Sequence, residues 1–205
     1  MSFDKLATKS SVEKTKTSLE KKGYEVIVVE RGKAALEYLI KTIPPSASLY
    51  SGSSVTLAQI GYFDYMSSGK HKWNDLKAKV RAENDQKKRT LLRRKSTLSD
   101  YYLGSVHALA ENGEFIIASN TASQLPLVVF TSPNPIFIVS TKKIVSSLEV
   151  GMDRLLNHVY PLEDKQSMVK YGEPTSLNKI VIFKGEPKDS GRKIRFVLVE
   201  EDLGF

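Results

Sequence analysis

The stretch that decides the fold is Ser51-Gly52-Ser53-Ser54-Val55-Thr56, which directly follows an apolar segment at residues 47–50. The apolar segment predicts a short strand, and Ser53 or Ser54 can cap a short helix over residues 55–60. In α/β sheets, ligands collect beyond the carboxyl ends of strands, where loops turn into helices. We therefore interpret this segment as a strand-to-helix junction at the mouth of such a sheet.

Strand-like and helix-like segments alternate on both sides of this junction. Expected helices lie at residues 1–22, 33–42, 62–67 and 144–158, and expected strands at 24–29, 102–109, 115–118, 136–140, 179–183 and 194–199. The turn-rich residues 184–193 should join the last two strands as a hairpin. The alternation predicts one α/β domain over residues 1–205, with a three-layer mixed sheet flanked by helices.

The composition limits the chemistry. The chain has no cysteine, which excludes disulfides, thiolate catalysis, thiolate zinc sites and iron–sulfur ligation. The three histidines are scattered without metal-ligand spacing, so we expect no metal site and the sequence identifies no cofactor. Charges fill the first 22 residues and no long apolar run occurs, which predicts a cytoplasmic protein that does not enter a membrane.

The net charge of +8 belongs to one segment. Residues 70–95 contain eleven Lys and Arg against three acids, and the remainder is balanced. Because residues 73–95 lack Gly and Pro, we expect one long, partly buried basic helix. Nucleic-acid binding is disfavoured, because no aromatic side chains interleave the basic cluster. Attraction of an anionic substrate or an acidic partner remains open.

Gly52 and the neighbouring hydroxyls form a candidate anion site. Backbone N–H groups at a helix start suit phosphate or carboxylate. The expected ligands are the hydroxyls of Ser51, Ser53, Ser54 and Thr56 together with the Gly52 backbone. The alternative is an ordinary serine-rich turn that caps a helix.

A second polar segment, Glu111-Asn112-Gly113, lies between two expected strands. Asn-Gly is a strong hairpin signal, so a surface turn with an incidental acid is one interpretation. The other makes Glu111 a general acid or base at the rim of the pocket, with Asn112 and Gly113 beside the ligand. It requires that the two polar segments face each other.

At these residues the chain resembles a known family. Residues 51–61 resemble the glycine-serine-serine-x-threonine-leucine-x-glutamate-isoleucine-glycine segment of the LUD domain, the lactate-utilisation family. Residues 108–114 resemble its alanine-glutamate-threonine-glycine-threonine segment, and residues 135–156, 172–176 and 195–202 resemble later parts. The chain departs from that pattern at Gln59, Asn112, Glu114 and Lys179.

The resemblance implies a fold similar to phosphosugar isomerases and CoA transferases, in which a glycine- and hydroxyl-rich loop binds an anion. It implies a small anionic metabolite, a hydroxy acid or a phosphorylated compound, in organic-acid metabolism. Thr175, Ser176 and Lys179 become further pocket candidates. The alternative is a non-catalytic subunit of a lactate or hydroxy-acid oxidation complex, which docks an acidic partner through the basic helix. A protein partner or a homo-oligomer is expected alongside the metabolite.

Overall fold

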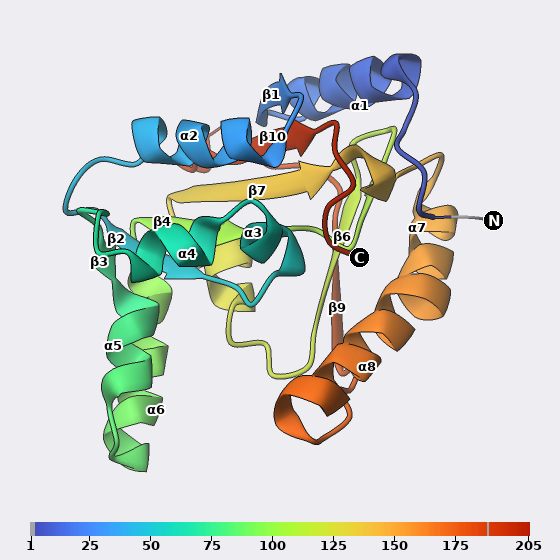
Figure 1. The fold of residues 1–205 in the computed structure, drawn as a ribbon. Coiled ribbons are helices and arrows are strands. Elements are labelled where there is room, and N and C mark those ends of the chain that lie inside the picture. Colours follow the sequence, from blue (N-terminus) through green and yellow to red (C-terminus); the bar gives the residue numbers. More distant parts are fainter. Residues whose placement is uncertain (1–2, 188) are drawn as a thin grey trace.

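The computed structural model describes residues 3–187 and 189–205. Its larger sheet is parallel and follows the order β1-β10-β7-β4-β2-β3 (Figure 1). These strands are β1 Glu25–Val29, β2 Ser48–Ser51, β3 Asn74–Asp75, β4 Tyr101–Gly104, β7 Asn134–Ser140 and β10 Arg195–Val199. Since parallel strands all end at the same edge of a sheet, the loops after β2, β4 and β7 meet there.

A smaller mixed sheet packs against the larger one. Its order is β8-β5-β6-β9, with β5 and β9 antiparallel to β6, and β8 parallel to β5. The strands are β5 Ala108–Ala110, β6 Phe115–Ser119, β8 Ile144–Val145 and β9 Lys179–Phe183. The β5–β6 turn contains Gly113 at φ +81°, a left-handed conformation that favours glycine.

Three hydrophobic clusters define the layers. On one face of the larger sheet, side chains such as Val197 pack under α2 (Gly32–Thr42), α3 (Val55–Gln59) and α4 (Tyr62–Ser67). On the other face, Phe196 and its neighbours meet α1 (Lys9–Lys21) and the smaller sheet. The far face of the smaller sheet is covered by α7 (Leu148–Arg154) and a π-helical turn (Leu155–Val159), and the helix continues from there as α8 (Tyr160–Tyr171).

The predicted α/β class with a sheet flanked by helices is confirmed. The alternating side chains of β10 explain why it lies centrally, because Phe196 and Leu198 enter one cluster while Val197 and Val199 enter the other. A strand that is apolar on both faces is typical of the interior of a parallel sheet.

The predicted hairpin between the last two strands is wrong. β9 pairs with β6 at the edge of the smaller sheet, whereas β10 lies between β1 and β7. Ile180 and Ile182 of β9 are exposed, which suits an edge strand, while β10 is fully buried. The turn residues between them therefore carry the chain from one sheet to the other.

The single strand predicted over residues 102–109 is also two strands. β4 ends at Gly104 in the larger sheet, and β5 begins at Ala108 in the smaller one. A Cβ on Gly104 would lie 2.6 Å from the Tyr102 hydroxyl, so the chain needs glycine where it leaves β4. The crossing residues, Ser105 to His107, become part of the pocket described below.

The long basic helix predicted over residues 73–95 is a helical hairpin. α5 (Leu76–Ala82) and α6 (Gln86–Lys95) lie side by side and project from the body (Figure 1). Two aspartates set the starts of the helices, because Asp75 accepts from Ala78 N and Asp85 accepts from Lys88 N. An N-cap inside a polar run separates two helices without glycine or proline.

Two other helix boundaries differ from the prediction. α1 begins at Lys9 because Thr8 accepts a hydrogen bond from Ser11 N as the N-cap. The first two residues of the predicted N-terminal helix lie outside the described residues. The helix expected over residues 144–158 begins at Leu148 and continues through the π-helical turn to Tyr171.

Candidate functional site

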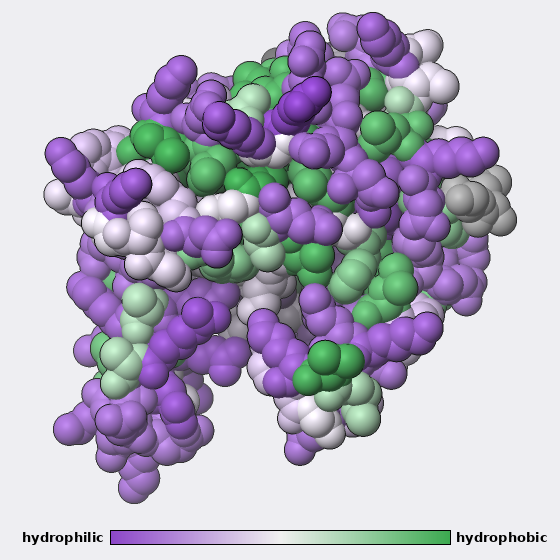
Figure 2. Space-filling view, in the orientation of Figure 1, coloured by the Kyte–Doolittle hydropathy of each residue, from purple (hydrophilic) through white to green (hydrophobic). Residues whose placement is uncertain are grey.

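A pocket of about 520 Å³ opens where the loops after β2, β4 and β7 converge. The hairpin α5–α6 forms one wall and α8 forms the opposite wall. Figure 2 shows the hollow between these two projections, with hydrophilic residues covering the hairpin. The pocket thus occupies the edge of the parallel sheet at which ligands of α/β proteins bind.

The loop after β2 enters this pocket, and the Tyr102 ring explains its glycine. Gly52 N donates to Leu103 O at 2.9 Å, and a Cβ on Gly52 would lie 2.9 Å from the Tyr102 hydroxyl. A larger residue would displace either the loop or the tyrosine. Ser54 accepts from Leu57 N at 3.3 Å and so caps α3.

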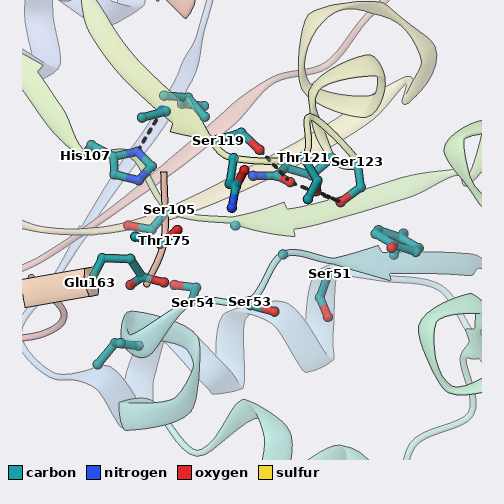
Figure 3. Close-up of a pocket in the computed structure, with 18 of the residues that line it drawn as sticks. Ser51, Ser53, Ser54, Ser105, His107, Ser119, Thr121, Ser123, Glu163 and Thr175 are labelled. Carbon is teal, nitrogen blue, oxygen red and sulfur yellow. Dashed lines mark hydrogen bonds between the residues drawn. The ribbon is translucent and has the colours of Figure 1, made fainter. Parts of the chain in front are cut away.

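Hydroxyl groups surround the rest of the cavity (Figure 3). They come from the first loop, from the β4–β5 crossing, from the segment after β6 and from the segment after α8: Ser51, Ser53, Ser54, Thr56, Ser105, Ser119, Thr121, Ser123, Thr175 and Ser176. Hydroxyls both donate and accept, so this lining can hydrogen-bond the oxygens of a polar ligand.

Lys143 is the buried cationic group of the pocket. It follows β7, is 5% exposed, and its Nζ donates to Thr56 Oγ1 and Ser105 Oγ at 3.1 Å and to Val106 O at 3.3 Å. Burial, and next the charges of Arg154 and Lys142, lower the pKa of Lys143 from 10.5 to about 7. The amine is therefore uncharged in a substantial fraction of molecules at neutral pH.

His107 lines the pocket as a neutral imidazole. Its Nδ1 accepts from Ala118 N at 3.1 Å, so the proton of the neutral ring resides on Nε2. Burial, followed by the charges of Lys143 and Arg154, lowers the pKa of His107 to about 3. His107 is consequently a hydrogen-bond donor to the pocket and not a cation.

Arg154 is buried next to His107 and contacts its backbone. The side chain is fully buried, and its guanidinium donates to the His107 carbonyl and lies 6.0 Å from the centre of the Phe3 ring. Burial lowers the pKa of Arg154 to about 10, so it stays charged at neutral pH. This fixed charge opposes protonation of both His107 and Lys143.

The wall formed by the hairpin is basic. Lys77 and Arg81 of α5 and Arg89 and Arg93 of α6 line the pocket, whereas Glu163 is the acid that lines it. Burial, and then the charge of Arg81, lower the pKa of Lys77 from 10.5 to about 8. Such a field attracts anions into the cavity.

The structure brings together seven of the predicted site residues in this pocket: Ser51, Gly52, Ser53, Ser54, Thr56, Thr175 and Ser176. Lys179 lies beside it, with Nζ donating to Asn120 O at 3.1 Å. The sequence interpretation missed Lys143, Ser105 and His107. Two lysines, Lys142 and Lys143, directly after a predicted strand could have indicated Lys143. No local pattern marks Ser105 or His107.

Glu111, Asn112 and Gly113 do not line this pocket. Glu111 accepts from Ser11 Oγ at 2.6 Å and from Lys14 Nζ at 2.7 Å, which joins the β5–β6 turn to α1. The hydrogen bonds from Lys14 and Ser11 lower the pKa of Glu111 below its ordinary value. The geometry gives this carboxylate a tethering contact, and the two polar segments do not face one cavity.

Metal-ligating clusters and membrane-spanning helices are both absent from the described part of the chain. Within residues 3–187 and 189–205, no group of three or more His, Cys, Asp or Glu side chains is arranged to hold a metal ion. Over the same residues, every helix is too short or too polar to cross a membrane. The cytoplasmic location and self-association stay predictions.

Comparisons with known proteins bear on the fold and the family. Residues 12–189 match the family model described as the LUD domain. A crystal structure of a DUF162 family protein from Deinococcus radiodurans is similar in fold, with a TM-score of 0.54 and 11% identity. That match covers 95% of this chain and 99% of the other. No curated protein matches the chain.

Proposed function

The chain belongs to the LUD domain family, and from this premise we propose that its pocket binds a small anionic metabolite, a hydroxy acid or a phosphorylated compound. At the level of the family, membership connects the chain to lactate utilisation. The class of metabolite, a hydroxy acid or a phosphorylated compound, is part of what we propose. The support comes from the chemistry of the pocket.

The charge of the pocket lining is the observation that carries the proposal. Among the described residues, five basic side chains line the cavity against the single acid Glu163: Lys77, Arg81, Arg89, Arg93 and Lys143. Their guanidinium and ammonium groups form charge-assisted hydrogen bonds with carboxylate or phosphate, which are stronger than neutral ones. A volume of about 520 Å³ suits a metabolite-sized ligand.

The two parts of the lining suggest how the ligand would lie. The hydroxyl-rich loop after β2 and the Ser105 hydroxyl face the inner end, next to Lys143. The hairpin arginines stand at the exposed side. A phosphate or carboxylate can therefore contact the basic wall while the hydroxyls hold the remaining polar atoms of the ligand.

The hairpin offers a matched test of this proposal. Arg89 and Arg93 line the pocket, whereas Lys87 and Lys88 of the same helix do not. We expect inorganic phosphate and L-lactate, tested separately by calorimetric titration, to bind the wild type. The double variant Arg89→Gln/Arg93→Gln should weaken binding about 10-fold or more, since hydrogen bonds to charged groups each contribute roughly 1.5–3 kcal/mol.

The control variant Lys87→Gln/Lys88→Gln removes the same charge from outside the pocket and should change the affinity by less than about 3-fold. Equal losses in both variants would point to the general field of the hairpin instead of a bound anion. Absence of binding by both anions to the wild-type protein would refute the proposal.

The outer side of the hairpin favours a second candidate function, the docking of an acidic partner. No residue of α6 is buried, and Lys87, Lys88, Arg94 and Lys95 are exposed outside the pocket lining. In that case Lys87→Gln/Lys88→Gln should weaken a salt-sensitive complex, measured by co-purification, while anion binding is preserved. A complex that is indifferent to these charges would exclude the hairpin as its docking surface.

A further inference from the structure

We propose that Lys143 is a nucleophile that forms an imine with the carbonyl group of a small anionic compound. The inference rests on the proposed anion-binding function and extends it to a covalent reaction. The ligand class would then be an anionic carbonyl compound, either a 2-oxo acid or a phosphorylated ketone or aldehyde.

Lys143 is held at the inner end of the pocket by hydrogen bonds and by close packing of the backbone. Its Nζ contacts the hydroxyls of Thr56 and Ser105 at 3.1 Å and the Val106 carbonyl at 3.3 Å. The backbone at Gly204 packs against it, and a Cβ there would lie 2.9 Å from Nζ. The side chain is thus fixed in one position while still lining the cavity.

The charge environment separates Lys143 from its neighbour. Among residues 3–187 and 189–205, no carboxylate lies within 4.0 Å of Lys143 Nζ, whereas Lys142 forms an ion pair with Asp202. The charges that lower its pKa, after burial, are those of Arg154 and Lys142, both positive. A desolvated lysine beside another cation is the arrangement that activates an amine for nucleophilic attack.

Both protonation states of this amine find partners. As an ammonium ion, Lys143 donates to three acceptors, Thr56 Oγ1, Ser105 Oγ and Val106 O. As a neutral amine, it can accept a hydrogen bond from either hydroxyl, because a hydroxyl both donates and accepts. The shift of its pKa to about 7 therefore leaves a neutral, hydrogen-bonded amine available near physiological pH.

The reaction balances without any redox partner. The lone pair of Nζ forms a bond to the carbonyl carbon, and the carbonyl oxygen takes the proton that the nitrogen loses, through the Thr56 or Ser105 hydroxyl. The resulting carbinolamine loses its hydroxyl group as water, with a second proton from nitrogen, and leaves a C=N bond. The anionic group of the same molecule would lie against the basic wall of Lys77, Arg89 and Arg93.

Borohydride trapping tests this inference. The folded protein is incubated with pyruvate in one arm and with dihydroxyacetone phosphate in the other, each with and without sodium borohydride. Hydride adds to the imine carbon and leaves a stable secondary amine. We expect one reduced adduct per chain, located on Lys143 by peptide mass spectrometry, and the arm with the higher yield identifies carboxylate or phosphate as the preferred anion.

Two variants and a binding measurement make the result decisive. Lys142→Arg should retain the adduct, and Lys143→Gln should lose it; if Lys143→Gln does not fold, the wild-type peptide map still decides. Adducts spread over exposed lysines, or thermal stabilisation by both compounds without an adduct on Lys143, would overturn the imine while anion binding stands. Neither stabilisation nor an adduct with either compound would overturn the imine, and the titrations of phosphate and L-lactate would then decide whether anion binding stands.

Discussion

The loop Ser51–Thr56 and the turn Glu111–Gly113 look alike in sequence, yet they occupy different places in the fold. Both combine glycine with short polar residues after a strand. The first opens into the pocket, and the second closes onto α1. The first follows a parallel strand at the edge where strand ends converge, whereas the second joins two antiparallel strands of the smaller sheet.

Each of the two segments also contacts a lysine, and the two contacts differ in kind. Thr56 accepts from Lys143, which is nearly buried and has no carboxylate partner among the described residues. Glu111 pairs with Lys14, whose side chain is 65% exposed. A buried amine without a counter-charge costs stability, whereas an exposed ion pair adds a little. The lysine contact of the first segment therefore lowers the stability of the fold, and that of the second adds to it.

The largest expected effect comes from Lys143→Met. The folded-state pKa of Lys143, about 7, lies below its ordinary value of 10.5, so the unfolded chain binds more protons between these two pH values. The stability of the wild type should therefore rise from pH 7 to 10, by an amount on the order of 3 kcal/mol from this group. Lys143→Met should be more stable than the wild type at pH 7, and urea unfolding should show the difference shrinking as pH rises.

An unchanged difference between pH 7 and 10 would mean that Lys143 titrates as an ordinary lysine. The two segments would then no longer differ in the charge state of the lysine that each one contacts. Lys14→Met provides the control, because the exposed Lys14 has a carboxylate partner. That variant removes an exposed amine with a counter-charge, whereas Lys143→Met removes a buried amine without one.

The two glycines should separate the segments by function. Gly113 has a positive φ, and a Cβ there would lie 3.1 Å from the backbone carbon of Ser18 in α1. Gly113→Ala should cost about 2 kcal/mol of unfolding free energy and leave phosphate affinity intact. Gly52→Ala should instead weaken phosphate binding, because its Cβ would press on the Tyr102 hydroxyl. Chemical unfolding and titration calorimetry with phosphate should be carried out on both variants. A loss of phosphate affinity in Gly113→Ala would contradict the prediction.

These differences mark what the sequence can predict. The strand, glycine and serines at residues 47–56 specify a local junction, because capping and turn conformation depend on neighbouring residues. The strand-to-helix alternation likewise gives the α/β class. The predictions that concerned only residues close in sequence were therefore confirmed for the most part.

The sequence could not show which segments meet. Lys143 reaches Thr56 and Ser105 across 87 and 38 residues, and Glu111 reaches Lys14 across 97. These contacts depend on the strand order, including the passage of residues 102–110 from one sheet to the other. The prediction of one long basic helix over residues 73–95 failed for a local reason. In the sequence Asp85 reads as one more charged residue of a helix, but in the structure it is the N-cap of α6.

A smaller effect is expected from the cap of α3. Ser54→Ala removes the hydroxyl that accepts from Leu57 N and should cost about 1 kcal/mol. Ser11→Ala removes a hydroxyl of similar exposure that donates to Glu111. Phosphate titration should detect Ser54→Ala and not Ser11→Ala, while thermal melts should register both. Equal phosphate affinity in the two variants would show that Ser54 caps the helix and does nothing else.

The smallest expected effect belongs to Glu111→Gln. The hydrogen bonds from Lys14 and Ser11 lower the folded-state pKa of Glu111 below 4.5, so its contribution is present above the unfolded pKa and disappears as pH falls through the folded value. At pH 7 the variant should lose less than about 1 kcal/mol, because the pair is partly exposed. The gap from the wild type should close as pH falls below 4.5 and through the lowered pKa of Glu111, as followed by acid titration of unfolding free energy. A much larger loss, or a loss of phosphate affinity, would mean that the turn contributes to the pocket after all.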